Sequence, residues 1–308
     1  MATVTDTQPA RPESGASQEP TAESIPGTAP GTPAAEVAAG EPHAVVVPSA
    51  RPVVSAVDPL VVGELRRVLG VTHVTAQALA RRGFVDPTDA RAWLAGRTDE
   101  VVPLPGLDDA AELVLRHVRA GNDLLVHGDY DVDGVSATAI LLDVLELLGA
   151  SPKWHLPKRG TDGYGLTSAS LERIGRLGPK LVITVDCGIT AVEQTALLRD
   201  AGIDVLITDH HLPRSDGVLP DTAILHPGVL DGELIARTGE PCGAGVAASL
   251  AVALLEATGH AAAPLRDGIS ELAALATIAD CVPLQGANRS TVRAGLGALA
   301  RTRRPGLR

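Results

Sequence analysis

Apolar and polar positions divide this chain of 308 residues into three stretches of different character. Residues 1–50 are rich in Ala, Pro, Gly, Ser, Thr and Glu and lack apolar periodicity, which is typical of a disordered tail. Residues 58–120 carry apolar side chains at helical spacing, and Asp86 followed by Pro87 indicates a helix start with Asp86 as its N-cap. We therefore expect a small helical subdomain, closed by an amphipathic helix over residues 107–120.

From residue 121 onward, short apolar strands alternate with amphipathic helices. The predicted strands are DLLVHGD, KWHLP, KLVITVDCG, DVLITDHH and TAILHP, in this order. Most of them are separated by helical segments, and two further helices follow, CGAGVAASLAVALLEATG and GISELAALATIAD. Because strands joined by helical crossovers pair in parallel, the pattern predicts an α/β fold with a doubly wound, mainly parallel sheet over residues 121–308.

Ionisable side chains follow three of the predicted strands. They are His127, Asp129, Asp131 and Asp133 after the first strand, Asp186 after the third, and Asp209, His210 and His211 after the fourth. Asp280 follows the last predicted helix. The carboxyl ends of parallel strands meet at one edge of the sheet, where ligands of open α/β folds bind. We therefore expect these groups to converge, with Gly134 letting the chain turn tightly into the helix after the first loop.

Each of these residues alone is compatible with an ordinary turn, helix cap or buried polar side chain. Together and without cations, the carboxylates would repel one another and lose solvation. One or two divalent cations remove that cost, and carboxylates with imidazoles suit Mn²⁺ or Mg²⁺. Since no P-loop and no dinucleotide-binding fingerprint follows any strand, the pattern predicts two-metal hydrolysis of a phosphoryl ester or anhydride.

Net charge, cysteine content and hydropathy bear on which partners and which compartment this chain has. The net charge of −11 argues against nucleic-acid binding through overall charge, although a local basic track beside an acidic metal site stays compatible with it. Cys187, Cys242 and Cys281 are few and far apart, which favours a reducing cytoplasm over a disulfide framework. No long apolar run suggests a membrane partner.

The motifs also carry a family resemblance. HGDYDVDG, GYGL, VDCG, TDHH, CGAGVA, IADCVPL and NRSTVRAGL occur in the order that is typical of the DHH phosphoesterase superfamily, and within it of RecJ-type single-stranded-DNA-specific exonucleases. The resemblance runs from about residue 58 to the end. It implies a DHH domain over residues 121–308 that lacks the second domain (DHHA1 type) and the OB-fold with which the family's catalytic half continues.

The resemblance implies a role for each site residue. It implies that one metal is held by His127, Asp131 and Asp186, and the second by Asp133, Asp186, His210 and Asp280. Three residues have catalytic roles by the same resemblance, namely His211 at the scissile phosphate or leaving group and Asp129 and Asp209 as its support. The residues implied to approach the substrate are Arg159, Gly163, Tyr164 and Gly165.

The implied activity is 5′-to-3′ digestion of single-stranded DNA in repair and recombination, with two Mn²⁺ or Mg²⁺ ions. A single-strand-binding protein and a helicase are the implied protein partners. Without the two further domains, we expect this chain to bind metal and to digest DNA poorly. Two alternatives stay open at this point: a DHH phosphoesterase for short oligonucleotides, cyclic dinucleotides or pyrophosphate, and a non-catalytic scaffold.

Overall fold

The structure is a computed structural model that describes residues 56–95, 104–230, 240–260 and 263–308. All described residues belong to one compact unit, Ser55–Arg308. The predicted tail, residues 1–50, therefore lies outside the described residues.

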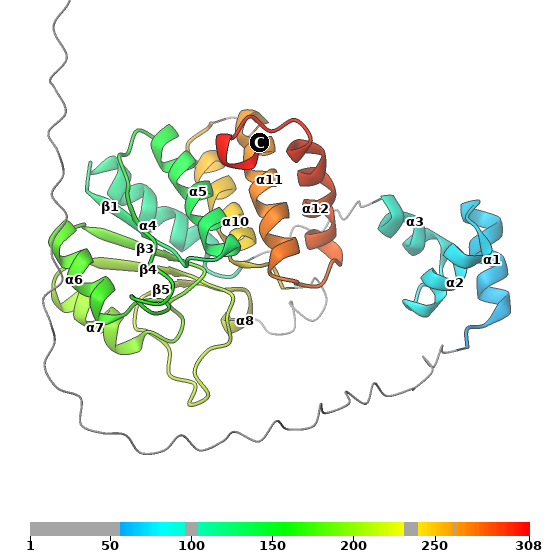
Figure 1. Cartoon of the computed structure of the whole chain (residues 1–308), viewed down its shortest axis with the longest axis horizontal. Coiled ribbons are helices and arrows are strands. Elements are labelled where there is room, and N and C mark those ends of the chain that lie inside the picture. Colours follow the sequence, from blue (N-terminus) through cyan, green and yellow to red (C-terminus); the bar gives the residue numbers. More distant parts are fainter. Residues whose placement is uncertain (1–55, 96–103, 231–239, 261–262) are drawn as a thin grey trace, which may run out of the picture. The chain divides into compact units, whose positions relative to one another are not determined.

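A five-stranded sheet with the order β2-β1-β3-β4-β5 lies at the centre of the α/β part (Figure 1). The strands are β1 (Leu124–His127), β2 (Lys153–His155), β3 (Leu181–Val185), β4 (Asp204–Thr208) and β5 (Ala223–Leu225). Each neighbouring pair is parallel, which confirms the predicted sheet. All the strands therefore end at the same edge, and β2 is an outer strand with one unpaired side.

Helices cover both faces of this sheet, because alternate strand residues point to opposite sides. Leu124 and Val126 of β1 pack into the larger apolar cluster, whereas Leu125 packs into the smaller one. The larger cluster holds α4 (Leu107–Arg119), α5 (Val132–Leu147), α10 (Gly243–Ala257) and α11 (Ala263–Ala279). The smaller cluster holds α6 (Ser168–Leu177) and α7 (Val192–Asp200). This double covering is visible in Figure 1 and confirms the doubly wound α/β fold.

Helix α12 (Gly286–Leu299) packs along α11 and was not predicted as a helix. The glycines of α12 lower its helix propensity, so the sequence pattern did not indicate a helix. Packing requires a glycine at position 295, since a Cβ at this position would lie 2.1 Å from the carbonyl oxygen of Ser270 in α11. The glycine thus permits close packing of the two helices. A short helix α8 (Pro227–Leu230) and a 3₁₀ turn η1 (Pro305–Leu307) complete the elements given for this part.

The N-terminal helices form a small cluster of their own. They are α1 (Pro59–Leu69), α2 (His73–Arg81) and α3 (Pro87–Ala95), packed through Leu65, Leu79 and Ala90. Asp86 accepts a hydrogen bond from the Thr88 amide at 2.6 Å, as an N-cap does. Helix α4, which was expected in this subdomain, packs on α10 and β5. No helix in the described ranges has the length and hydropathy needed to cross a membrane.

Candidate metal centre

The loop between β1 and α5 brings three aspartates to the carboxyl edge of the sheet. Asp131 caps α5, and its Oδ1 accepts a hydrogen bond from the Gly134 amide at 3.0 Å. Asp133 lies in the first turn, where the helix dipole favours a carboxylate. Gly134 is helical rather than a turn residue, which corrects the expected role. A Cβ at Gly134 would lie 2.6 Å from the backbone of Asp129, so this glycine makes room for Asp129 instead.

Helix α10 fixes the carboxylate of Asp133. Its two oxygens accept hydrogen bonds from the amides of Gly243 at 2.6 Å and Ala244 at 2.7 Å. These amides belong to the helix N-terminus, where backbone donors lack partners within the helix. Asp133 is 2% exposed, and each carboxylate oxygen keeps further acceptor capacity. The amides therefore hold the carboxylate in place without blocking a cation.

Asp186 follows β3 and adopts a strained backbone conformation, with a φ of 60°. An L-residue pays on the order of 1 kcal/mol for this left-handed conformation, which is concentrated at functional sites. The N-terminus of α10 approaches so closely that a Cβ on Gly243 would lie 2.6 Å from both Cβ and Oδ1 of Asp186. The side chain is thereby buried between β3 and α10.

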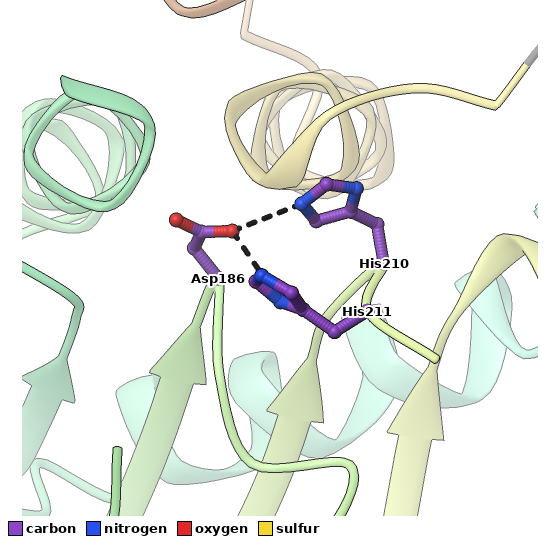
Figure 2. Close-up of side chains that lie close together, drawn as sticks. All are labelled: Asp186, His210 and His211. Carbon is purple, nitrogen blue, oxygen red and sulfur yellow. Dashed lines mark ion pairs between the residues drawn. The ribbon is translucent and has the colours of Figure 1, made fainter. Parts of the chain in front are cut away.

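His210 lies among three carboxylates. Its Nε2 is 3.1 Å from Asp186 Oδ1, 3.6 Å from Asp133 Oδ2 and 3.8 Å from Asp280 Oδ2. Figure 2 shows one carboxylate oxygen of Asp186 facing the rings of both His210 and His211. Burial lowers the pKa of His210, but the close contact with Asp186 and the three negative charges outweigh burial and raise it to about 9. Burial raises the pKa of Asp186 and of Asp280.

Several buried polar atoms in this cluster lack hydrogen-bond partners. Among the described residues they include Asp129 Oδ1, Asp186 Oδ1 and His210 Nε2. Asp186 and His210 are only 3.1 Å apart, yet the contact lacks hydrogen-bond geometry. Asp186 Oδ1 and His210 Nε2 are thus held by an ion pair without a well-formed hydrogen bond, and buried polar atoms in this state gain from a further partner. A divalent cation is such a partner for carboxylate oxygens and an imidazole nitrogen.

Three groups of ligand atoms in the described part of the chain lie within 4.8 Å of one another. They are Asp186 with His210 and His211, Asp133 with His210 and Asp280, and Asp129 with Asp131 and Asp186. Asp186 and His210 each occur in two groups, as expected of shared positions between two ions. The residues present therefore fit a two-metal centre.

Asp209 has a different environment from the other acids. Its Oδ1 accepts hydrogen bonds from the amide of His210 at 2.7 Å and from Nδ1 of His211 at 2.8 Å, and its Oδ2 accepts one from the Ile189 amide at 2.9 Å. Burial alone would raise the pKa of Asp209, but these hydrogen bonds hold it below its usual value. The same hydrogen bond raises the pKa of His211. Asp209 is thus occupied with orienting the two histidines.

His127, predicted as a metal ligand, does not join the three groups. Its Nε2 lies 3.1 Å from the carbonyl oxygen of Gly165, and its Nδ1 lies 3.1 Å from Nδ1 of His155. A proton on Nε2 of His127 and on Nδ1 of His155 satisfies both contacts. Burial lowers the pKa of His127 to about 4, so the ring stays neutral. Asp129, predicted as support, lies in one group with Asp131 and Asp186.

The segment predicted to approach substrate borders the centre. Tyr164 donates a hydrogen bond to the carbonyl oxygen of Asp186 at 3.2 Å, and its Oη lies 3.1 Å from Nδ1 of His211. Gly163 and Gly165 have φ of 81° and 70°, which side chains rarely adopt. Arg159 is exposed and lies 4.8 Å over the Tyr130 ring. Arg159 and Tyr164 thus present a cation and a half-exposed hydroxyl beside the carboxylates.

Comparison with known proteins agrees with this geometry. The family model described as DHH family, N-terminal domain, matches residues 123–277. The chain belongs to the DHH family.

Its relatives within the DHH family include single-stranded-DNA-specific exonucleases named RecJ. The chain is 36% identical over 251 residues to that of Bacillus subtilis (strain 168), covering 80% of this chain and 30% of the relative. The corresponding values for Thermus thermophilus are 38% over 247 residues, 80% and 34%. A crystal structure of RecJ from Thermus thermophilus in complex with Mn²⁺ matches with a TM-score of 0.68 and 35% identity, covering 82% of this chain and 35% of that one. This chain thus spans about a third of the length of these relatives.

Sequence reasoning missed three contributors to the DHH site. Gly243 and Ala244 act through backbone amides, and His155 acts by contacting His127. The available signal for the first two was the CGAGVA segment, which was noted as a motif without a role. A small residue at a helix start is the pattern that permits a close backbone approach to an anion.

Proposed function

We propose that this chain is the metal-binding part of a phosphodiesterase that removes nucleotides from the 5′ end of single-stranded DNA. The observation that carries the proposal is the convergence of five carboxylates and two histidines in three overlapping groups, with Asp186 Oδ1 and His210 Nε2 buried and unpaired. The RecJ relatives support this substrate over pyrophosphate or cyclic dinucleotides, and over a scaffold role.

In this proposal the two ions are Mn²⁺ or Mg²⁺. When bound, they would supply a water-derived nucleophile and neutralise charge on the phosphoryl oxygens. Asp133, His210 and Asp280 would hold one ion, and Asp129 and Asp131 the other. Asp186 would be shared, since it is close to both groups.

His211 is positioned to hold a proton at the reacting phosphate. Its Nδ1 donates to Asp209, and its side chain is 44% exposed, so the ring is accessible to a substrate. That hydrogen bond raises the pKa of His211 above its usual value. A protonated Nε2 would donate to a phosphoryl or leaving-group oxygen. Tyr164 also restricts the ring, since its Oη lies 3.1 Å from the same Nδ1.

Partners and compartment follow from the same relatives and belong to the proposal. Single-stranded DNA is the proposed substrate, and a single-strand-binding protein and a helicase are the proposed protein partners in repair and recombination. The free cysteines Cys187, Cys242 and Cys281 support a reducing compartment such as the cytoplasm.

The test compares three substrates with the same chain and Mn²⁺: a 5′-phosphorylated 30-nucleotide single strand, a dinucleotide and pyrophosphate. We expect mononucleotides to be released slowly from the single strand, since this chain is expected to digest DNA poorly, and the reaction to stop when the metal is chelated. A variant in which His211 is replaced by Ala should retain bound Mn²⁺ and lose hydrolysis.

A matched control replaces Asp200 by Asn, since Asp200 is an exposed acid at the end of α7 away from the three groups. This variant should hydrolyse DNA as the unmodified chain does. Hydrolysis of pyrophosphate alone would contradict the proposed substrate. Absence of bound Mn²⁺ in the unmodified chain would contradict the metal centre itself.

A further inference from the structure

A second feature lies on the outer side of the sheet, beside strand β2. A cavity of about 720 Å³ opens between β2, the start of α6 and the loop that joins them. Its lining includes the aromatic side chain of Trp154 and the charged side chains of Lys158, Asp162, Arg173 and Arg176. We call it the β2-edge cavity. It does not contain any of the candidate metal ligands.

The cavity is positively charged in a chain whose net charge is −11. Arg173 and Arg176 share one face of α6, because residues three apart in a helix are neighbours. With Lys158 they set three cations against one lining acid, Asp162. Asp162 already accepts hydrogen bonds from the Lys158 amide at 2.9 Å and from Thr161 at 2.7 Å. Neither arginine forms an ion pair among the described residues, so both remain available to an anion.

Another cavity shows that this charge is not general. A cavity of about 630 Å³ at the opposite end of the sheet sets Arg199 against three acids, Asp200, Asp204 and Asp221. Arg199 is paired with Asp221. That cavity would repel phosphate groups, whereas the β2-edge cavity would attract them.

The β2-edge cavity also offers an aromatic surface. Trp154 lies on the outer strand and is 57% exposed, although burial of an indole would contribute favourably to folding. An exposed indole beside unpaired cations is the combination that single-stranded nucleic acids use, with bases on the ring and phosphates on the cations. Aromatic residues make up only 2% of the chain, so the position of this one is informative.

One loop connects the cavity to the metal centre. Lys158 and Asp162 line the cavity, and Tyr164, a few residues further, contacts Asp186 and His211. On the strand side, His155 lines the cavity and contacts His127 of β1. A single strand of DNA that leaves the metal centre across this loop would therefore reach Trp154.

We propose that the β2-edge cavity binds a segment of single-stranded DNA away from the cleaved bond, with a base on Trp154 and phosphates on Lys158, Arg173 and Arg176. The inference rests on the proposed function and deepens it by placing the strand. It gives this acidic chain a local basic track.

The first test uses Trp154 as its own reporter. Replacing Trp93 by Phe leaves Trp154 as the single indole, since the chain has two tryptophans. In buffer without divalent metal, a 15-nucleotide oligo(dT) should quench its fluorescence by stacking. Trp154→Ala should weaken binding of a labelled 15-mer about tenfold, whereas Trp154→Phe should weaken it less, because a ring remains.

The second test measures how much the arginine charges contribute to DNA binding. Replacing Arg173 and Arg176 by Glu together should weaken binding and reduce the slope of log affinity against log salt by about 1.4, or about 0.7 for each lost phosphate contact. The control is Arg119→Glu, the same type of substitution at one exposed arginine of α4 outside the cavity. It should leave both the affinity and the slope unchanged.

Substrate length separates this proposal from the proposed function. The cavity variants should raise KM for a 15-mer at least fivefold and leave cleavage of a dinucleotide unchanged, because a dinucleotide occupies only the metal centre. Trp154-dependent binding without hydrolysis would support the cavity and overturn the nuclease. Equal cleavage of the 15-mer by all variants, or quenching by an acidic peptide but not by oligo(dT), would overturn the cavity proposal.

Discussion

Two clusters of acids in this chain differ in how the repulsion between their carboxylates is balanced. At the metal centre, Asp129, Asp133 and Asp186 are buried close together without a lysine or arginine partner among the described residues. At the C-terminal clamp, which we define as Asp143, Glu271 and Arg304, one guanidinium binds both acids. Arg304 Nε lies 2.8 Å from Glu271, and its other branch pairs with Asp143.

The difference separates a structural cluster from a functional one. The clamp brings its own cation, which joins α5, α11 and the C-terminal segment. The metal centre keeps unpaired atoms, strained backbone at Asp186 and a histidine with a raised pKa. A buried acid cluster without an internal cation is therefore the one to test for a bound metal.

The largest effect should come from Asp186, which belongs to two of the three groups. Replacing it by Ala should abolish binding of the metal pair and lower hydrolysis by at least about a thousandfold, since both ions lose a ligand. Calorimetry with Mn²⁺ and a nuclease assay measure the two effects. Asp143→Asn, from the clamp, is the matched control and should keep full metal stoichiometry. Unchanged stoichiometry in the Asp186 variant would refute the shared ligand.

Substitutions in the C-terminal clamp should change the free energy of unfolding rather than metal binding. Replacing Arg304 by Ala leaves Glu271, which is 4% exposed, without its cation and should lower the free energy of unfolding by about 2 kcal/mol. Adding Glu271→Gln should recover part of that loss, because a neutral amide costs less to bury. Urea denaturation gives both values. Affinity for Mn²⁺ should stay the same in both variants, and a large loss of affinity would break the distinction between the clusters.

Gly243 connects packing to the metal centre. Replacing it by Ala places a Cβ against Asp186 and should lower the free energy of unfolding by about 1–3 kcal/mol through overpacking. Metal affinity should fall with it, since Asp133 and Asp186 both contact this turn. The control is Gly175→Ala in α6, where no atom lies within 4 Å, and this change should stabilise by about 0.5–1 kcal/mol. Thermal unfolding with and without Mn²⁺ checks the pair.

The last effect concerns the pH dependence of metal binding. The pKa of His210 is raised to about 9, so below that value a cation must displace its proton. Affinity for Mn²⁺ should therefore increase with pH between 7 and 9, by up to about tenfold for each unit. Below about 7 the dependence should steepen, because burial raises the pKa of Asp186 to about 7 and a second proton is displaced. Titration calorimetry in buffers of different ionisation enthalpy counts these protons, and a flat pH profile would contradict the assignment.

Most of the fold was predictable, because strand and helix periodicity are local properties. The five strands and their parallel pairing were predicted from such patterns. Helix α12 was not, since its glycines weaken the helical pattern and its stability depends on packing against α11. Likewise α4 has an ordinary amphipathic pattern, which does not reveal the cluster that its apolar face joins.

The sequence by itself determined which residues could meet at the edge of the sheet, because parallel strands end at the same edge. It did not determine which of them would face the same point. His127 and Asp129 lie two positions apart, yet His127 turns to Gly165 and His155 while Asp129 faces Asp131 and Asp186. Only the tertiary structure decided this, because the direction of a loop side chain depends on partners distant in sequence. The same holds for Asp133, whose partners on α10 follow it by more than a hundred residues.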